Sequence, residues 1–370
     1  MLFLLILCGV VSTLAAGVLV RSGRRSAERY RLDMPQRFHA GHVPRLGGVG
    51  MLAACSLGWL WMVVAQPYLG VPNGIHFSPD EALAWCVAAS IAACGGTAED
   101  VLHQLRARWR LVFTVAAAIV GVQMLELRIQ GLGFEQIDRA WATAGWPAFI
   151  LAVLAISGLP HAFNIIDGYN GLAGAVAAIC CLAIAYVALQ NGDRQLASVV
   201  LVLAGSTAGF LLWNYPRGLI FAGDGGAYLW GTVIAMACIL LVQRHPLVSP
   251  WFPMLLLSYP VLETGFSVYR KLVRGQSPSM ADALHFHQLI YRRIVREVFE
   301  GDDEARRMLT RNNRTSPYLW AFSLFTVVPA VMFWQNTWVL MVCCGLFVAV
   351  YVWAYTSIVR FKVPRWLRGR

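Results

Sequence analysis

Charged residues are scarce in this chain. Of its 370 residues only 13% are Asp, Glu, Lys or Arg, whereas 58% are hydrophobic. A soluble domain of this length needs more charge to cover its surface, so the composition predicts an all-α polytopic membrane protein. Nucleic acid is excluded as a partner despite the net charge of +11, because no soluble domain remains to bind it.

Cysteine motifs and a typical leader sequence are also missing. The nine cysteines form neither a CxxC pair nor a Cys/His spacing typical of metal ligands, so they are interpreted as small apolar residues. The apolar opening, residues 2–20, has no basic segment before it, and basic residues follow it instead. This arrangement favours an uncleaved first span with its N-terminus outside.

Eleven apolar runs are long enough, or nearly so, to cross a bilayer. An odd number of spans places the C-terminus in the cytoplasm. All but four of the 30 Lys and Arg residues then lie on the cytoplasmic side, as the positive-inside rule requires. The long basic loop 268–317 is part of this single membrane domain, residues 1–370. The runs lie near residues 2–20, 47–66, 82–97, 111–128, 146–163, 171–189, 196–213, 226–242, 250–267, 318–335 and 337–358.

Polar residues gather in five segments that all fall on the predicted cytoplasmic side. Transporters instead place ionisable residues near the middle of the bilayer, often in two related halves. Clustering at one interface, without a detectable internal repeat, favours an enzyme whose active site lies in the cytoplasmic loops. The segments are 33–48, 95–104, 164–174, 214–231 and 270–293.

Four carboxylates stand at the predicted helix ends. Glu99 and Asp100 end the third span, Asp167 ends the fifth, and Asp224 precedes the eighth. An acidic side chain at a helix C-terminus opposes the helix dipole, and a bound cation removes that cost. Their convergence predicts hard oxygen ligands for a divalent metal, Mg²⁺ or, as the alternative, Mn²⁺.

Each carboxylate also has an ordinary interpretation. The first three can be solvated charges that pair with arginines of segment 106–110, and Asp224 can be a simple helix N-cap. The glycines beside Asp224 favour a binding role, because they permit close backbone approach and a helix N-terminus attracts phosphate. The second and sixth spans also start at glycine-rich turns, so three helix N-termini are predicted to cradle a diphosphate.

Two histidines lie in the long basic loop. On a continuous helix His285 and His287 would point roughly 200° apart, so they can serve one ligand only where the backbone is irregular. In the alternative interpretation, the segment from about 281 to 300 is an amphipathic helix at the membrane surface. Its lipid-facing residues would be Leu284, Leu289, Ile290, Ile294 and Val298.

Together these segments resemble the signatures of the polyprenyl-phosphate N-acetylhexosamine-1-phosphate transferases. That superfamily includes phospho-MurNAc-pentapeptide translocase. The resemblance covers spans two to nine, with its motifs in the family's order and on one side of the membrane. The matching stretches are PRLGG, EDV, NIIDGYNGL, AGDGGAY and HFHQ.

The resemblance implies transfer of an amino-sugar 1-phosphate from a UDP-N-acetylhexosamine to undecaprenyl phosphate, with release of UMP. It implies a place in the bacterial inner membrane and in the synthesis of O-antigen or a related polysaccharide. The peptidoglycan translocase is the alternative within the enzyme class. A transporter or a non-catalytic scaffold is the alternative outside it, and a homodimer is a further expectation.

Roles for individual residues also follow from the resemblance. Asp224 and Asp100 are implied as Mg²⁺ ligands, and these two together with Glu99 as the catalytic carboxylates. Glu99 and Asn170 stand where the family commonly has aspartate. The residues implied in substrate binding are Asn164, Asp167, Asn170, Asn214, His285, His287, Arg274, Arg45 and His39.

Overall fold

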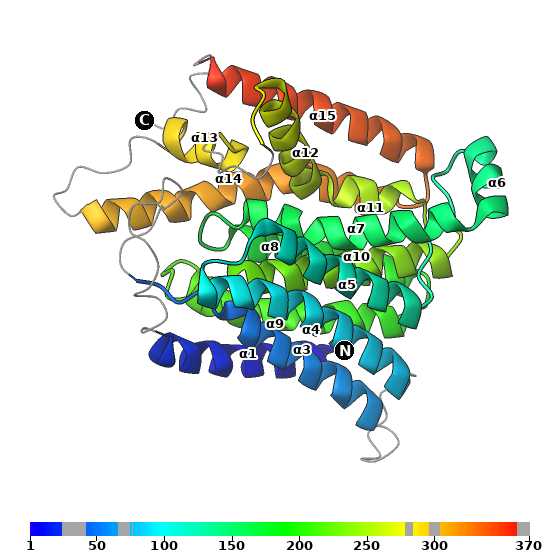
Figure 1. The fold of residues 1–370 in the computed structure, drawn as a ribbon, viewed down its shortest axis with the longest axis horizontal. Coiled ribbons are helices and arrows are strands. Elements are labelled where there is room, and N and C mark those ends of the chain that lie inside the picture. The colour runs from blue at the N-terminus through cyan, green and yellow to red at the C-terminus, as the bar shows by residue number, and fades with distance from the viewer. Residues whose placement is uncertain (24–41, 66–74, 76, 278–283, 296–303, 361–370) are drawn as a thin grey trace.

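A computed structural model describes residues 1–23, 42–65, 75, 77–277, 284–295 and 304–360. Every element within these residues is an α-helix, and ten of the helices are long and apolar enough to cross a membrane (Figure 1). The prediction of an all-α polytopic membrane protein is therefore confirmed. The ten are α1 (Leu2–Ser22), α3 (Gly47–Val64), α4 (Pro79–Leu102), α5 (Ala107–Met124), α7 (Trp146–Ile166), α8 (Leu172–Gln190), α9 (Arg194–Asn214), α10 (Gly223–Arg244), α14 (Glu304–Met332) and α15 (Thr337–Val359).

The predicted span 250–267 differs from the others, because the chain there forms two helices. These are α11 (Trp251–Leu256) and α12 (Ser258–Val273), separated at Leu257. Pro260 has no N–H to donate to the carbonyl group of Leu256, so a continuous helix would leave that carbonyl without its partner. The break turns α12 away from the path of a single straight span (Figure 1).

Helix α10 is the central element of the bundle. Nearly all of its residues are buried, and it packs against α3, α4 and α7. The outer helices bury much less: α1 and α3 lie at one edge of the view and α15 at the other (Figure 1). Any site built on α10 is therefore held by the best-packed part of the fold.

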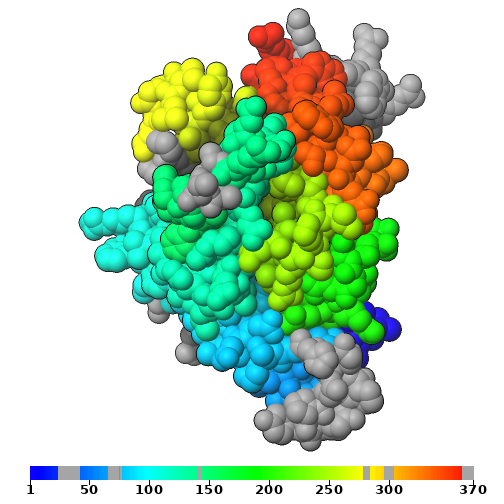
Figure 2. Space-filling model, turned by 90° about the vertical axis from the view of Figure 1, so that its right-hand side faces the viewer, coloured from blue at the N-terminus to red at the C-terminus, as the bar shows by residue number. Residues whose placement is uncertain are grey.

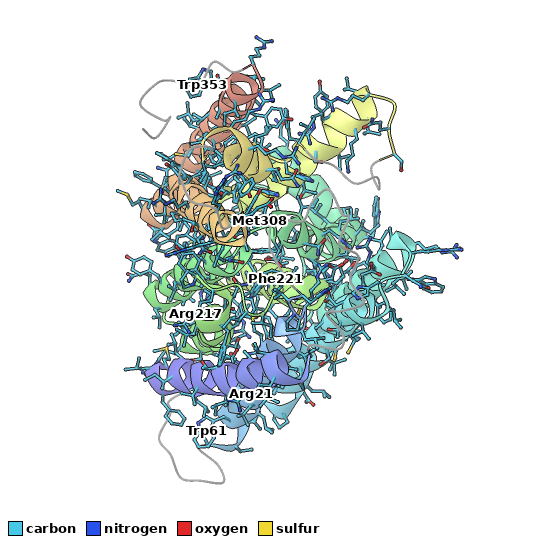
Figure 3. All side chains as sticks on the ribbon, turned by 90° about the vertical axis from the view of Figure 1, so that its left-hand side faces the viewer. Arg21, Trp61, Arg217, Phe221, Met308 and Trp353 are labelled. Carbon is cyan, nitrogen blue, oxygen red and sulfur yellow. The ribbon has the colours of Figure 1, made fainter. Side chains whose placement is uncertain are left out.

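The two ends of the bundle carry different polar groups. α3 and α10 begin at the end where α4, α7 and α9 finish, and Figure 3 looks onto this end, with Arg217 and Phe221 labelled. Figure 2 looks onto the opposite end, where α6 (Glu135–Ala144) lies. There α10 finishes, and Arg244 pairs with Glu81 and Asp193 at 3.2 and 3.3 Å. The predicted active-site carboxylates all belong to the first end.

The predicted lipid-facing helix over 281–300 is wrong in surroundings and, within the described residues, in extent. Residues 281–283 and 296–300, Val298 among them, lie outside the described residues. Within the described residues the segment forms α13 (Phe286–Arg293), which is eight residues long. Leu289, Ile290 and Ile294 are buried by the protein itself, so they do not face lipid. Helix α13 is thus part of the core between α14 and α15.

We expect the contact between α1 and α9 to depend on the absence of a side chain at Gly209. A methyl group there would overlap the carbonyl oxygen of Gly9. Gly209→Ala should therefore lower the free energy of unfolding by about 1–3 kcal/mol, because an overpacked interface must shift. The loss of folded protein on heating in detergent measures this decrease in stability. Gly345→Ala in α15 is the control, since no atom lies within 4 Å of the added methyl group. Equal melting of both variants would contradict the expectation.

Candidate active site

The beginning of α10 is a point where three helix backbones touch. The N–H groups of Gly47 and Gly48 donate to the carbonyl oxygens of Phe221 and Ala222, each at 2.9 Å. A Cβ atom on Gly48 would overlap the backbone of α10, and so would one on Gly96 of α4. The glycines predicted to cradle a diphosphate therefore bring helices together here, and these N–H groups of α3 are bonded within the protein.

Asp100 holds the first turn of α10. Its two carboxylate oxygens accept hydrogen bonds from the backbone N–H groups of Asp224 and Gly225, both at 3.0 Å, and Arg45 Nε lies 3.3 Å from Oδ1. A carboxylate is favoured at a helix N-terminus, because it satisfies N–H groups that lack a partner within the helix. Asp100 thereby acts as a cap supplied by another helix, a contact that the sequence did not reveal. Its predicted roles in metal binding and catalysis stay predictions.

Asp224 is surrounded by donors from three other parts of the chain. Its Oδ1 accepts from Asn164 Nδ2 at 2.8 Å and from Arg45 Nη2 at 3.3 Å, while its Oδ2 accepts from Arg110 Nη1 at 3.1 Å. The carboxylate makes no hydrogen bond as a cap for its own helix. The alternative interpretation of Asp224 as a simple N-cap is therefore wrong.

Glu99 accepts a hydrogen bond from the turn that follows α4, and its charge also acts on Arg110. Its Oε2 accepts from the backbone N–H of Leu105 at 2.7 Å and so stabilises the turn after α4. The arginines of segment 106–110 were predicted to pair with Glu99, Asp100 or Asp167. Arg110 instead forms an ion pair with Asp224. The two members of the acidic pair thus have different hydrogen-bond partners, Asp100 in α10 and Glu99 in the loop after α4. The catalytic role of Glu99 stays a prediction.

Asp167 lies at the end of α7 and shares the electric field of this cluster. The carboxyl group is half-buried, and the loss of hydration raises its pKa to about 7. Arg45 lowers that pKa and Asp224 raises it, so both lie within electrostatic reach of Asp167. The structure therefore gathers Asp100, Asp167 and Asp224 at one end of the bundle.

Asn170 and Asn214 make hydrogen bonds around the turn that follows α7. Asn214 Oδ1 accepts from the backbone N–H of Gly171 at 2.6 Å, and its Nδ2 donates to the carbonyl oxygen of Ile220 at 2.8 Å. Asn170 donates from its backbone to Asn312 Oδ1 at 2.8 Å and from Nδ2 to Asn313 Oδ1 at 2.9 Å. Both side chains thus join the turn after α7 to its neighbours, and their roles in substrate binding stay predictions.

The rings of the two histidines lie side by side. His285 precedes α13 in extended conformation (φ −65°, ψ 148°), so the backbone is irregular between them. Their rings stack with centroids 5.3 Å apart and planes 5° from parallel. His287 also meets the edge of the Tyr169 ring at 5.6 Å. The pair therefore lies against the turn that follows Asp167.

One of the remaining predicted residues has no described contact with this cluster, one lies outside the described residues, and Arg110 was not among the predicted site residues. Arg274 is exposed at the end of α12, and His39 lies outside the described residues. Arg110 was considered only as a surface charge. Its basic character at the start of the fourth span was visible in the sequence, but its pairing with Asp224, 114 positions later, was not.

These contacts define an integral membrane protein with a site of carboxylates, arginines and amides at one end of a helical bundle. The model of glycosyl transferase family 4 matches residues 82–242, which run from the first turn of α4 to the last turn of α10 and hold all three central aspartates. The chain belongs to this family, as its relatives also establish.

The relatives are bacterial undecaprenyl-phosphate transferases. The chain is 30% identical to a probable undecaprenyl-phosphate N-acetylglucosaminyl 1-phosphate transferase of Bacillus subtilis, over 69% of this chain and 68% of the relative. It is 25% identical to the undecaprenyl-phosphate alpha-N-acetylglucosaminyl 1-phosphate transferase of Escherichia coli K12, over 73% and 71%. The Yersinia pestis protein of the same name is 24% identical, over 70% and 69%.

Removal of the charge on Asp100 should destabilise the protein even without substrate. Asp100→Asn leaves one oxygen for two backbone donors, so we expect a loss of about 2 kcal/mol in the free energy of unfolding. Thermal unfolding in detergent measures it. Glu99→Gln is the matched control: its amide oxygen can still accept from Leu105, and its melting point should stay close to that of the original protein. An unchanged melting point for Asp100→Asn would show that the cap is dispensable.

Proposed function

We propose that this protein transfers N-acetylglucosamine 1-phosphate from UDP-N-acetylglucosamine to undecaprenyl phosphate and releases UMP. Membership of glycosyl transferase family 4 and the names of the relatives support the reaction and the lipid substrate. The observation that carries the proposal is the position of Asp224, which faces two arginines and Asn164 at the first turn of the central helix. We assign the product to the first membrane step of a cell-envelope polysaccharide such as O-antigen.

The side chains around Asp224 suit a magnesium ion that binds together with the substrate. Mg²⁺ commonly uses one or two carboxylates and completes its shell with phosphate oxygens and water. Among the described residues no three acidic, histidine or cysteine side chains form a ready-made metal site, so a protein-only cage does not fit. Asp224 would hold the ion, with Asp167 as the nearby second carboxylate, because the partners of Asp224 are side chains that can move aside, whereas Asp100 caps backbone N–H groups of α10.

Bound Mg²⁺ supplies charge neutralisation for the diphosphate. Arg45 and Arg110, released in part from Asp224, bind the phosphate oxygens and hold the diphosphate in line for attack. An oxygen of the lipid phosphate forms the new bond to the sugar-bearing phosphorus, and the bond to the UMP oxygen breaks with its electron pair. No proton has to be removed when the lipid phosphate is a dianion. The site therefore acts by positioning and electrostatics, with direct attack in place of a covalent aspartyl intermediate.

The site would face the cytoplasm of a bacterial inner membrane. The described arginines support this orientation, because Arg21, Arg45, Arg110 and Arg217 belong to the end of the bundle that carries the aspartates. Positive residues are retained on the cytoplasmic side of membrane proteins. A nucleotide sugar would arrive there from solution while the polyprenyl chain remains in the bilayer.

Substitution of Asp224 should abolish turnover. Asp224→Asn keeps an oxygen for Asn164 but removes the charge, so UMP release from UDP-N-acetylglucosamine, undecaprenyl phosphate and Mg²⁺ should fall at least about 100-fold. Chelation of the metal should stop UMP release by the original protein, and added Mg²⁺ or Mn²⁺ should restore that release. Glu135→Gln, an exposed carboxylate at the opposite end, is the control and should retain full rate. Full activity of Asp224→Asn with normal folding would refute its role.

A panel of sugar nucleotides separates the proposed substrate from its competitor. The same purified protein is given UDP-N-acetylglucosamine, other UDP-amino sugars or UDP-MurNAc-pentapeptide. The proposal expects UMP release with the first compound. Release with the pentapeptide alone would instead identify a peptidoglycan translocase, and release with none would remove the transferase assignment.

A further inference from the structure

A buried glutamate outside the predicted site is bonded to the first of the two histidines. Glu263 lies within α12 and is 1% exposed. Its Oε1 accepts from the backbone N–H of Phe286 at 2.8 Å and lies 3.2 Å from His285 Nδ1, while its Oε2 accepts from the hydroxyl group of Tyr351 at 2.9 Å. A carboxylate in such a place is costly unless several donors satisfy it. Here the donors come from both sides, α13 and α15.

The charge of Glu263 decides how the imidazole of His285 is oriented. An ionised carboxylate only accepts hydrogen bonds, so His285 Nδ1 must carry the proton. The other ring nitrogen, Nε2, is then the one available to a ligand, as it is in metal sites where a carboxylate fixes a histidine from behind. Other ionisable groups near this carboxylate are Tyr259 of α12 and His287 of α13, and Arg270 of α12 lies within electrostatic reach of Tyr351.

The histidine pair transmits this orientation to the transferase site. His285 stacks on His287, and a Cβ atom on Gly168 would lie 3.0 Å from His287 Nε2. Gly168 follows Asp167 directly, so the imidazoles form one side of the turn that carries that aspartate. Figure 1 shows α12 and α13 grouped beside α15, on the α14 side of the bundle.

We propose that Glu263 is a positioning residue for the transfer reaction, acting through His285 to present the histidine pair to the phosphates of the sugar nucleotide. The inference rests on the proposed function and adds to it a residue from the broken span 250–267. It requires the negative charge of Glu263, in addition to its hydrogen bonds.

Two substitutions separate charge from shape. Glu263→Gln keeps the length of the side chain and an oxygen for Phe286, but it removes the charge. Glu263→Asp keeps the charge and shortens the reach. For a positioning role we expect kcat/KM for the UDP-sugar to fall about tenfold or more in Glu263→Gln and to be partly restored in Glu263→Asp. The KM for undecaprenyl phosphate should change less than about twofold, because the lipid does not use this contact.

Tyr351→Phe is the matched control, since it removes one hydrogen bond from the same carboxylate and leaves its charge. This variant should lose thermal stability but keep kcat/KM within about threefold of the original protein. If Glu263→Gln were as active as the original protein, or more active than Glu263→Asp, the role would be structural and the inference overturned. An original protein that releases no UMP from any donor would instead overturn the proposed function.

Discussion

The hydrogen bonds from the backbone of Asp224 and Gly225 to the carboxylate of Asp100 fix the geometry of the whole site. They join the end of α4 to the beginning of α10, the most deeply buried helix. Such an arrangement is possible because glycine lets the backbone of α3 and α4 approach α10 without a side chain between them. Asp224 is thereby presented on a rigid turn, with its carboxylate free to contact residues from other helices.

Charge balance follows from that geometry. Asp224 lies within electrostatic reach of Asp167 and of Asp100, and Arg45 contacts Asp100 and Asp224 directly. Arg110 adds a second positive charge to Asp224. The two arginines thus offset part of the negative charge of the three carboxylates. The arrangement suits a reaction between two polyanions.

Helices α12, α13 and α15 support the site through a chain of contacts that ends at the turn after Asp167. Glu263 connects α12 to α13 and α15, and the histidine pair connects α13 to the turn after Asp167. Asn170 and Asn214 complete that support, because they tie the same turn to α14 and to the loop before α10. The break in the predicted span 250–267 is what allows this, since α12 can then leave the direction of α11 and place Glu263 beside His285.

The sequence by itself determined the class of protein, the positions of the long helices and the family, because long apolar runs and motifs of adjacent residues are local properties. It also located Asp100, Asp167 and Asp224 at helix ends. Only the tertiary structure decided which partners those aspartates have: Asp100 accepts hydrogen bonds from α10, and Asp224 pairs with Arg110. It also decided that His285 contacts Glu263. Each of these contacts joins residues far apart in the chain, and their formation depends on how buried helices pack, which no local pattern of residues encodes.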